Sequence, residues 1–312
     1  MKNIIFIEGL PGTGKSTISN WITAKLNNQG KKAILLEEEN LAIPTNFYHI
    51  ASLEKAIFHN LCQSNQDKAA ALKNIAMYEE NYIFIPIDHA PDELQSELYN
   101  YELGDEYNKS FNPESYIEQS LLRVSGSIKN LNTETNFVVI DSGLLQNPIN
   151  ELLYRGATDN QIKNYVKDIT KLFEPYNPIY IYLNRGGAKE SLDFARSVKG
   201  EGWYNRIEGM LKATGTPNHF ERRYHLEIDF LAQNMMPWLD CKVTVNDWTS
   251  VKEMIQAKII SNPINQPMLE EMSAFFNKRV NSYDEHMLVE VGGCKEGYLK
   301  MAELIPKNLK IC

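Results

Sequence analysis

Apolar residues along the chain occur as short runs, separated by longer segments in which they recur at helical spacing. The short runs predict buried strands at residues 3–8, 32–36, 137–141, 179–183 and 239–245. Residues 3–36 contain strand, helix and strand in turn, a βαβ unit that requires parallel strands. We therefore expect an α/β fold with helices on both faces of a parallel sheet.

The segments between these runs are mainly helical in pattern. Helical spacing marks residues 16–28, 50–80, 113–131, 158–173, 220–231 and 251–260. Tyr82–Ile87 is rich in β-forming residues but contains Pro86, which cannot donate a ladder hydrogen bond. We expect this run at the edge of a sheet or in a hairpin.

Residues 9–16, Gly-Leu-Pro-Gly-Thr-Gly-Lys-Ser, match G-x-x-x-x-G-K-[ST], the phosphate-binding P-loop. A chance match in a glycine-rich turn would lack the strand before the motif and the helix after it. Glycines let backbone N–H groups turn toward phosphate oxygens, and the helix N-terminus adds its dipole. The predicted nucleotide-binding residues are Gly9, Pro11, Gly12, Thr13, Gly14, Lys15, Ser16 and Thr17. The predicted fold class is therefore a three-layer P-loop NTPase.

A second chemical signal is Asp141, which ends the apolar run Phe137–Asp141. Apolar β-formers that end in Asp downstream of a P-loop form the Walker B pattern, whose carboxylate holds Mg²⁺. We expect Ser16 and Asp141 to be the protein's ligands to that metal, and Lys15 to neutralise charge on the β- and γ-phosphates. The alternative is an Asp that only caps the next turn.

Three glutamates, Glu37, Glu38 and Glu39, follow the second predicted strand. Side chains alternate along a strand, so we expect Glu37 and Glu39 to share an orientation and Glu38 to point away. Either Glu37 or Glu39 would act as a general base or bind an acceptor hydroxyl. The alternative is a solvated acidic loop.

Two later segments are biased in charge. Residues 88–106, within an insertion expected at about 82–112, contain acidic residues and no Lys or Arg; they form a substrate-facing lobe or an acidic surface. Residues 184–223 are rich in Lys, Arg and Gly and predict a mobile flap that closes on the phosphates and excludes water. Arg185 and Arg196 are its candidate catalytic residues, although surface salt bridges would explain these arginines equally well.

Composition narrows the class of protein. The chain has 312 residues, 43% of them hydrophobic, and a net charge of −8, which argues against general nucleic-acid binding. The cysteines are widely spaced, which predicts reduced thiols and a cytoplasmic protein. They are Cys62, Cys241, Cys294 and Cys312. No apolar run is long enough for a membrane span and no signal peptide is evident, so we expect no membrane partner. A homodimer remains open.

The P-loop and the Phe137–Asp141 strand, together with Arg206-Ile207-Glu208 and residues 220–224, resemble the thymidylate-kinase and deoxynucleoside-kinase branch of P-loop kinases. The resemblance implies a lid segment that supplies arginines. It covers residues 1–260 and is specific only at the P-loop. The family usually has Arg after the acidic residue at this strand end, whereas here Ser142 follows Asp141, which leaves the phosphate acceptor undefined.

The chain after residue 262 has a different pattern. Residues 261–267 are polar with two prolines and predict a boundary between a kinase-like domain, 1–262, and a helical tail, 263–312. Residues 274–306 resemble the opening segment of class I S-adenosylmethionine-dependent methyltransferases. The sequence ends before any cofactor loop, so we expect no methyl transfer. The alternative is an ordinary helical appendage.

These patterns together predict Mg-ATP-dependent phosphoryl transfer to the hydroxyl or phosphate of a small molecule. The expected ligands are ATP, Mg²⁺ and that acceptor. A regulatory module that hydrolyses ATP or GTP to switch a partner is the alternative, and the flap favours transfer because a switch needs no acceptor pocket. A sulfotransferase-like enzyme is disfavoured by the pairing of Lys15-Ser16 with Asp141.

Overall fold

The computed structural model describes residues 3–38, 40–104, 112–129, 131, 135–233, 238–244 and 248–260. The chain divides into one unit of residues 1–254 and a second of residues 255–312. The predicted boundary at 261–267, the methyltransferase-like segment, Glu39, Cys294 and Cys312 lie outside the described residues. The second unit is described only over the end of helix α11 (Trp248–Ile255) and the π-helical turn η4 (Gln256–Ile260).

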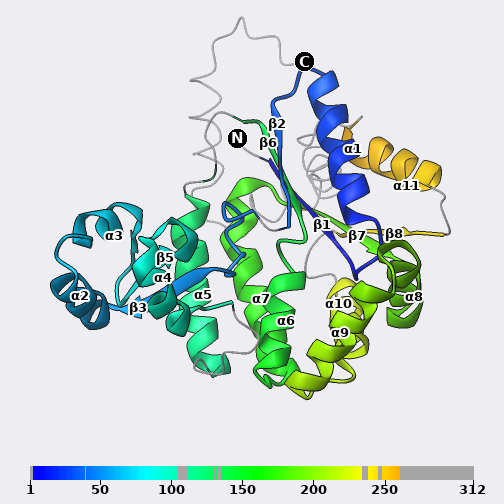
Figure 1. Ribbon diagram of the computed structural model, residues 1–312. Coiled ribbons are helices and arrows are strands. Elements are labelled where there is room, and N and C mark those ends of the chain that lie inside the picture. The colour runs from blue at the N-terminus through cyan, green and yellow to red at the C-terminus, as the bar shows by residue number, and fades with distance from the viewer. Residues whose placement is uncertain are drawn as a thin grey trace, which may run out of the picture. The chain divides into compact units, whose positions relative to one another are not determined.

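The first unit is built on a parallel sheet with strand order β2-β6-β1-β7-β8 (Figure 1). Its strands are β1 Asn3–Glu8, β2 Ala33–Leu36, β6 Phe137–Asp141, β7 Ile179–Asn184 and β8 Trp238–Lys242. Each overlaps a predicted run, although β8 ends at Lys242, before the end of the run predicted at 239–245. Because the strands are parallel, the carboxyl ends of β2, β6 and β1 lie side by side at one edge. The predicted three-layer α/β P-loop fold is confirmed.

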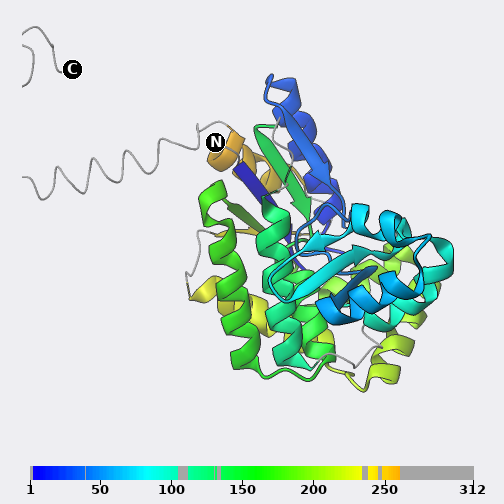
Figure 2. The ribbon, with the colours of Figure 1, turned by 90° about the vertical axis from the view of Figure 1, so that its left-hand side faces the viewer.

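Different helices cover the two faces, because side chains alternate along each strand. On one face, Ile4 and Phe6 share a core with several helices, three of them long. These are α5 Pro113–Ile128, α7 Asp159–Phe173 and α10 His219–Ala232. The Phe173 ring of α7 meets Phe6 edge-on, with 4.9 Å between ring centres. Figure 2 shows α5 and α7 packed side by side along this face.

Helix α1 (Lys15–Asn28) covers the opposite face and buries Ile18, Ile22 and Leu26, which recur on one side of a helix. Helix α11 lies beside α1 (Figure 1), and Lys252 Nζ lies 5.7 Å from the centre of the Trp21 ring. The P-loop therefore runs from the central strand of the sheet into a helix that is anchored along its whole length.

Residues 50–104 form a separate lobe around an antiparallel sheet of order β3-β5-β4 (Figure 1). Its strands are β3 Ile50–Glu54, β4 Met77–Tyr78 and β5 Tyr82–Pro86. Its helices and 3₁₀ turns are α2 Lys55–Ser64, α3 Ala69–Ile75, η1 Ile87–His89, α4 Asp92–Leu98 and η2 Tyr99–Tyr101. The predicted acidic insertion overlaps this lobe, although residues 105–111 lie outside the described part.

For this lobe, the predicted start of a helix was wrong, and of the two places expected for residues 82–87 the hairpin is confirmed and the sheet edge is not. The helix expected from residue 50 begins only at Lys55, because β3 is buried on both faces: Ala51 and Leu53 in the lobe core, Ile50 in the main core. The expected edge strand is the central strand, β5. It forms a hairpin with β4, which reaches only as far as Phe84 and so makes no demand on the missing N–H of Pro86.

The predicted flap, residues 184–223, is largely helical. It contains α8 Ala188–Lys199, α9 Glu201–Thr214 and the start of α10. Gly200 separates α8 from α9 at φ 84°, and Gly215 ends α9 at φ 71°. Two elements not yet named precede the flap in the chain: helix α6 Gln146–Tyr154 and the 3₁₀ turn η3 Glu174–Tyr176. Within the described residues no helix is long and apolar enough to cross a membrane, and Cys62 and Cys241 are buried free thiols.

Candidate functional site

The P-loop lies between β1 and α1, and its shape depends on glycine at two positions. Gly12 has φ 82°, and a Cβ there would lie 2.6 Å from the Ser191 carbonyl oxygen of α8. Gly14 has φ 91°, and a Cβ there would lie 1.9 Å from the ring of Trp248. Trp248, the first residue of α11, therefore packs directly on the loop.

Lys15 begins α1 and is buried, with its Nζ 3.3 Å from the Leu10 carbonyl oxygen. Burial, and to a smaller extent the charge of Arg223, lowers the pKa of its ammonium group, and the nearby carboxylates of Glu38, Asp141 and Glu8 act in the opposite direction. Lys15 is thus held in a crowded, mostly negative environment at the ends of three neighbouring strands. Such a cation is suited to polyanionic phosphate, which would replace these partners.

Asp141 ends β6, where the register places it beside Ile7 of β1. Burial raises the pKa of its carboxyl, while hydrogen bonds from the Ser16 and Ser142 hydroxyls and the charge of Lys15 lower it. Ser142 Oγ donates to Asp141 Oδ1 at 2.9 Å. The two predicted metal ligands, Ser16 and Asp141, therefore lie in direct contact.

Of the two glutamates described after β2, Glu38 is the one that acts on the P-loop lysine. Among the carboxylates, Glu38 has the largest effect on the pKa of Lys15, and it also raises the pKa of Asp141. The side-chain amide of Gln146 donates a hydrogen bond to it. Glu37 is exposed, with no such contact to the site, and Glu39 lies outside the described residues. Strand β2 ends at Leu36, so the alternation expected of a strand does not extend over the glutamates. The expectation that Glu38 points away from the site is therefore wrong, Glu37 has no described contact there, and the prediction for Glu39 is not tested.

Glu8, the last residue of β1, is a site residue that sequence reasoning missed. It is fully buried and accepts hydrogen bonds from the backbone N–H groups of Leu144, at 2.5 Å, and Gln146, at 3.3 Å. Burial raises the pKa of its carboxyl to about 7, against the lowering effect of the Leu144 hydrogen bond. The sequence feature that could have identified Glu8 is a charged residue at the end of an apolar strand, immediately before the P-loop.

A buried ion pair on α10 lies under the other side of the loop. Arg223 Nη2 donates to the Gly9 carbonyl oxygen at 3.2 Å, and its Nε donates to Glu227 Oε1 at 2.5 Å. The Tyr182 hydroxyl of β7 donates to Glu227 Oε2 at 2.7 Å. Because both charges are fully buried and satisfied, this pair fixes the position of Gly9.

The two flap arginines have different surroundings. Arg185 lies against the P-loop: its Nε donates to the Gly12 carbonyl oxygen at 2.8 Å, and its guanidinium carbon lies 3.6 Å from the centre of the Phe194 ring. Arg196 is exposed and makes a bidentate pair with Glu201 at 2.7 Å. Arg185 is therefore positioned at the phosphate loop, whereas Arg196 is engaged within the flap.

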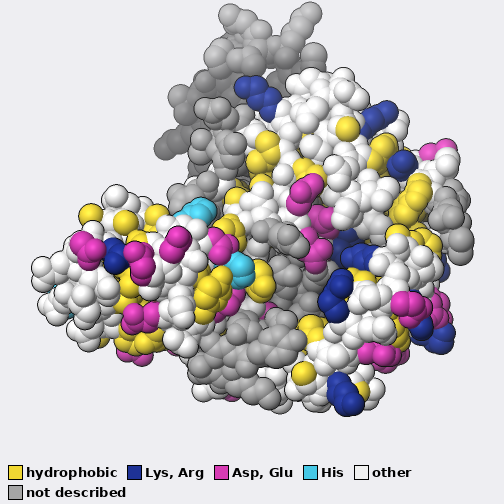
Figure 3. All heavy atoms as spheres, in the orientation of Figure 1, with side chains coloured by type: hydrophobic (Ala, Val, Ile, Leu, Met, Phe, Trp, Pro, Cys, Tyr) yellow, Lys and Arg dark blue, Asp and Glu magenta, His cyan; other side chains and the backbone are white. Residues whose placement is uncertain are grey.

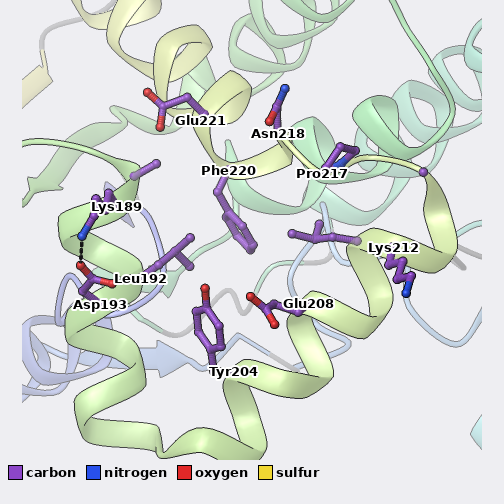
Figure 4. Close-up of a pocket in the computed structure, with 13 residues that line it drawn as sticks. Lys189, Leu192, Asp193, Tyr204, Glu208, Lys212, Pro217, Asn218, Phe220 and Glu221 are labelled. Atoms are coloured by element: carbon purple, nitrogen blue, oxygen red, sulfur yellow. Dashed lines mark hydrogen bonds and ion pairs between the residues drawn. The ribbon is translucent and has the colours of Figure 1, made fainter.

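A cavity of about 660 Å³ lies within the flap, between α8, α9 and α10. Figure 4 shows Phe220 in its middle, Tyr204 and Glu208 directed toward it, and the Lys189–Asp193 ion pair at its edge. Its lining includes no P-loop residue and no residue from the ends of β2 or β6. This cavity is separate from the site of Lys15 and Asp141.

A second cavity, of about 460 Å³, begins at Glu38 and extends between the sheet edge and the lobe. Its described lining residues are Glu38, Leu41, Asn46, Phe47, Tyr48, His49, Asp88, Gly104, Asn147 and Glu151. Carboxylate side chains gather over the lobe on this face of the molecule (Figure 3). This volume is in the range of small-molecule binding pockets.

A family model described as chromatin associated protein KTI12 matches residues 2–83, which hold the P-loop and the first part of the lobe. Among solved structures, deoxyadenosine kinase from M. mycoides with bound dCTP is 16% identical over 83% of this chain and 100% of that chain, with a TM-score of 0.39. The same enzyme with the products dCMP and a flexible dCDP is 18% identical over the same shares, with a TM-score of 0.33. No curated protein matches the chain. By its sheet order and P-loop, the chain has a nucleotide-kinase-like fold.

Proposed function

We propose that this protein transfers the terminal phosphoryl group of a nucleoside triphosphate to the hydroxyl group of a small molecule held in the cavity at Glu38. One observation carries the proposal: Lys15, Asp141 and Glu38 converge from the ends of three adjacent strands, and a cavity opens at Glu38. A pure nucleotide switch needs no such cavity. The family model that matches residues 2–83 is described by chromatin association, not by a reaction, so the proposal rests on the site itself.

In this proposal the backbone N–H groups of residues 11–15 surround the phosphates and Lys15 neutralises their charge. Glu38 is exposed and lines the cavity, and its charge affects the pKa of Lys15 more than that of any other carboxylate. It accepts the proton of the acceptor hydroxyl while the new oxygen–phosphorus bond forms and the bond from the γ-phosphorus to the bridging oxygen breaks. The nucleoside diphosphate leaves, and most of the catalysis is positioning and charge stabilisation.

The donor set fits Mg²⁺. The Ser16 hydroxyl and the Asp141 carboxylate are hard oxygen ligands in contact with each other. Among the described residues no group of three His, Cys, Asp or Glu forms a metal cage. That is typical of a metal that takes its other ligands from phosphates and water. Bound there, Mg²⁺ would neutralise charge on the phosphates, and Asp141 would be held ready for it by Ser16 and Ser142.

Arg185 is the flap residue best placed to act on the transferring group, because it is already bound to the loop at Gly12. For Arg196 to act there, its pair with Glu201 would first have to break. We assign the role of transition-state stabilisation to Arg185, and Arg196 stays a prediction that depends on flap movement.

The test is acceptor-dependent formation of ADP from Mg-ATP by the purified chain, measured with a panel of hydroxyl compounds. Lys15→Ala is expected to abolish this turnover while the circular dichroism spectrum and melting temperature stay close to those of the wild type. Lys25→Ala, the same change near the other end of α1, is the matched control and should retain activity. Full turnover by Lys15→Ala would contradict the proposal. Phosphate release that no acceptor stimulates would favour the regulatory switch instead.

A further inference from the structure

The cavity at Glu38 has an uneven charge. Three carboxylates line it: Glu38 from the end of β2, Asp88 from η1 of the lobe, and Glu151 from α6. None of the described residues that line it is Lys or Arg. A phosphate monoester normally requires Arg or Lys as a partner, and here it would meet like charge.

Two arginines that lie against lining residues, Arg155 at Glu151 and Arg123 at Phe47, are engaged in other contacts. Arg155 pairs with Glu151, donates to the Leu103 carbonyl oxygen at 2.9 Å, and has a side chain only 3% exposed. Arg123 is also buried and donates to the Pro44 carbonyl oxygen at 2.6 Å. Neither presents a guanidinium group to the cavity without losing these contacts. Glu151 is paired with Arg155 and Glu38 lies near Lys15, so Asp88, whose described ionisable partner His49 is charged only when protonated, is the carboxylate most available to a cation.

The lobe end of the cavity combines a carboxylate with aromatic rings. Tyr48, 54% exposed, stacks on His49 with 4.1 Å between ring centres. His49 Nδ1 lies 2.7 Å from Asp88 Oδ2. The faces of aromatic rings attract cations, and a neighbouring carboxylate adds a charge partner. This chemistry suits an ammonium group.

The sheet end of the cavity is formed by Glu38, whose carboxylate accepts a hydrogen bond from the side-chain amide of Gln146. A carboxylate can accept a further hydrogen bond from a hydroxyl or an ammonium group and repels an anion.

We propose that the acceptor is an amino alcohol: a hydroxyl compound whose protonated amine lies between Tyr48 and Asp88 while its hydroxyl faces Glu38. This inference rests on the proposed function and specifies its substrate class. It excludes nucleoside monophosphates and other phosphate monoesters as acceptors. The cavity, at about 460 Å³, accommodates a molecule the size of an amino sugar or larger.

The experiment compares acceptors that share a scaffold and differ in charge: glucosamine, glucose and glucose 6-phosphate, and likewise an aminonucleoside, its parent nucleoside and the nucleoside 5′-monophosphate. The amine-bearing member should have a kcat/KM at least about tenfold above its neutral partner, the factor expected of one favourable charge contact. The phosphorylated member should show no turnover. A neutral or phosphorylated member that matches or exceeds the amine overturns the inference.

Asp88→Asn is the decisive variant. It should raise KM for the amine-bearing acceptor about tenfold, with kcat and the KM for Mg-ATP nearly unchanged. Glu97→Gln removes one exposed carboxylate from α4 of the same lobe and should change nothing. Unchanged discrimination in Asp88→Asn contradicts the assigned amine position. If no compound of any charge stimulates Lys15-dependent ADP formation, the proposed function itself fails, which is a different result from the loss of charge preference.

Discussion

Replacing Gly12 by Ala tests whether the flap is seated on the phosphate loop. The backbone at Gly12 has φ 82°, which L-residues rarely adopt, and the added Cβ would lie 2.6 Å from Ser191 O and 2.8 Å from Ala195 N. Both atoms belong to the backbone of α8, so the helix must move as a body. Gly30 has φ 74°, and a Cβ added there would meet no atom within 4 Å, so Gly30→Ala shares only the backbone strain.

The difference in stability between Gly12→Ala and Gly30→Ala measures the contact between the P-loop and α8. Left-handed backbone in a non-glycine residue costs about 1–2 kcal/mol, and forced overlap in a packed region adds about 1–3 kcal/mol. Urea unfolding should therefore place Gly12→Ala about 1–3 kcal/mol below Gly30→Ala in free energy of unfolding. Titration with a fluorescent ATP analogue should show weaker binding only for Gly12→Ala. Equal stabilities and equal nucleotide affinities for the two variants would refute the seating of α8 on the loop.

Three further variants probe buried and exposed charges. The pKa of the Glu8 carboxyl is about 7 in the folded protein against 4.5 as the ordinary value, so the fold favours the neutral form and stability declines as the pH rises from about 4.5 to about 7. Glu8→Gln should therefore gain stability relative to the wild type, by at most about 3 kcal/mol, between pH 5 and pH 8 in melting experiments; a difference that does not change with pH would contradict the shift. Arg185→Ala should lower kcat about 100-fold. Arg196→Ala, which removes an exposed ion pair, should change kcat by less than about twofold, and the reverse ranking would reassign the flap arginine.

The sequence predicted the sheet because its signals are local. Each parallel strand is a short apolar run, and the P-loop motif fixes which strand is first and where its helix begins. The lobe was harder, because β3 is identified only by its partner: Ile50–Glu54 pairs with β5 and is buried between two cores, while its spacing with later residues suggests a helix. Long-range pairing of that kind leaves no periodic trace.

Site residues that belong to a sequence motif could be predicted, whereas those whose role depends on the fold around them could not. Lys15, Ser16 and Asp141 come from patterns with a chemical meaning, and the structure brings them together. Choosing among the glutamates required knowing that β2 ends at Leu36 and that Gln146 holds Glu38. The role of Glu8 depends on N–H groups more than a hundred residues away in the chain, a contact that only the fold creates.

The central claim, that Glu38 is the carboxylate acting on the acceptor, is tested most directly by comparing kcat for Glu38→Gln and Glu37→Gln with the same acceptor and Mg-ATP. The two residues are neighbours, both are exposed, and both changes remove one charge. The account predicts that Glu38→Gln loses about 100-fold or more in kcat, as expected for removal of a general base, while Glu37→Gln stays within about twofold. Equal activity in the two variants, or a larger loss in Glu37→Gln, would contradict it.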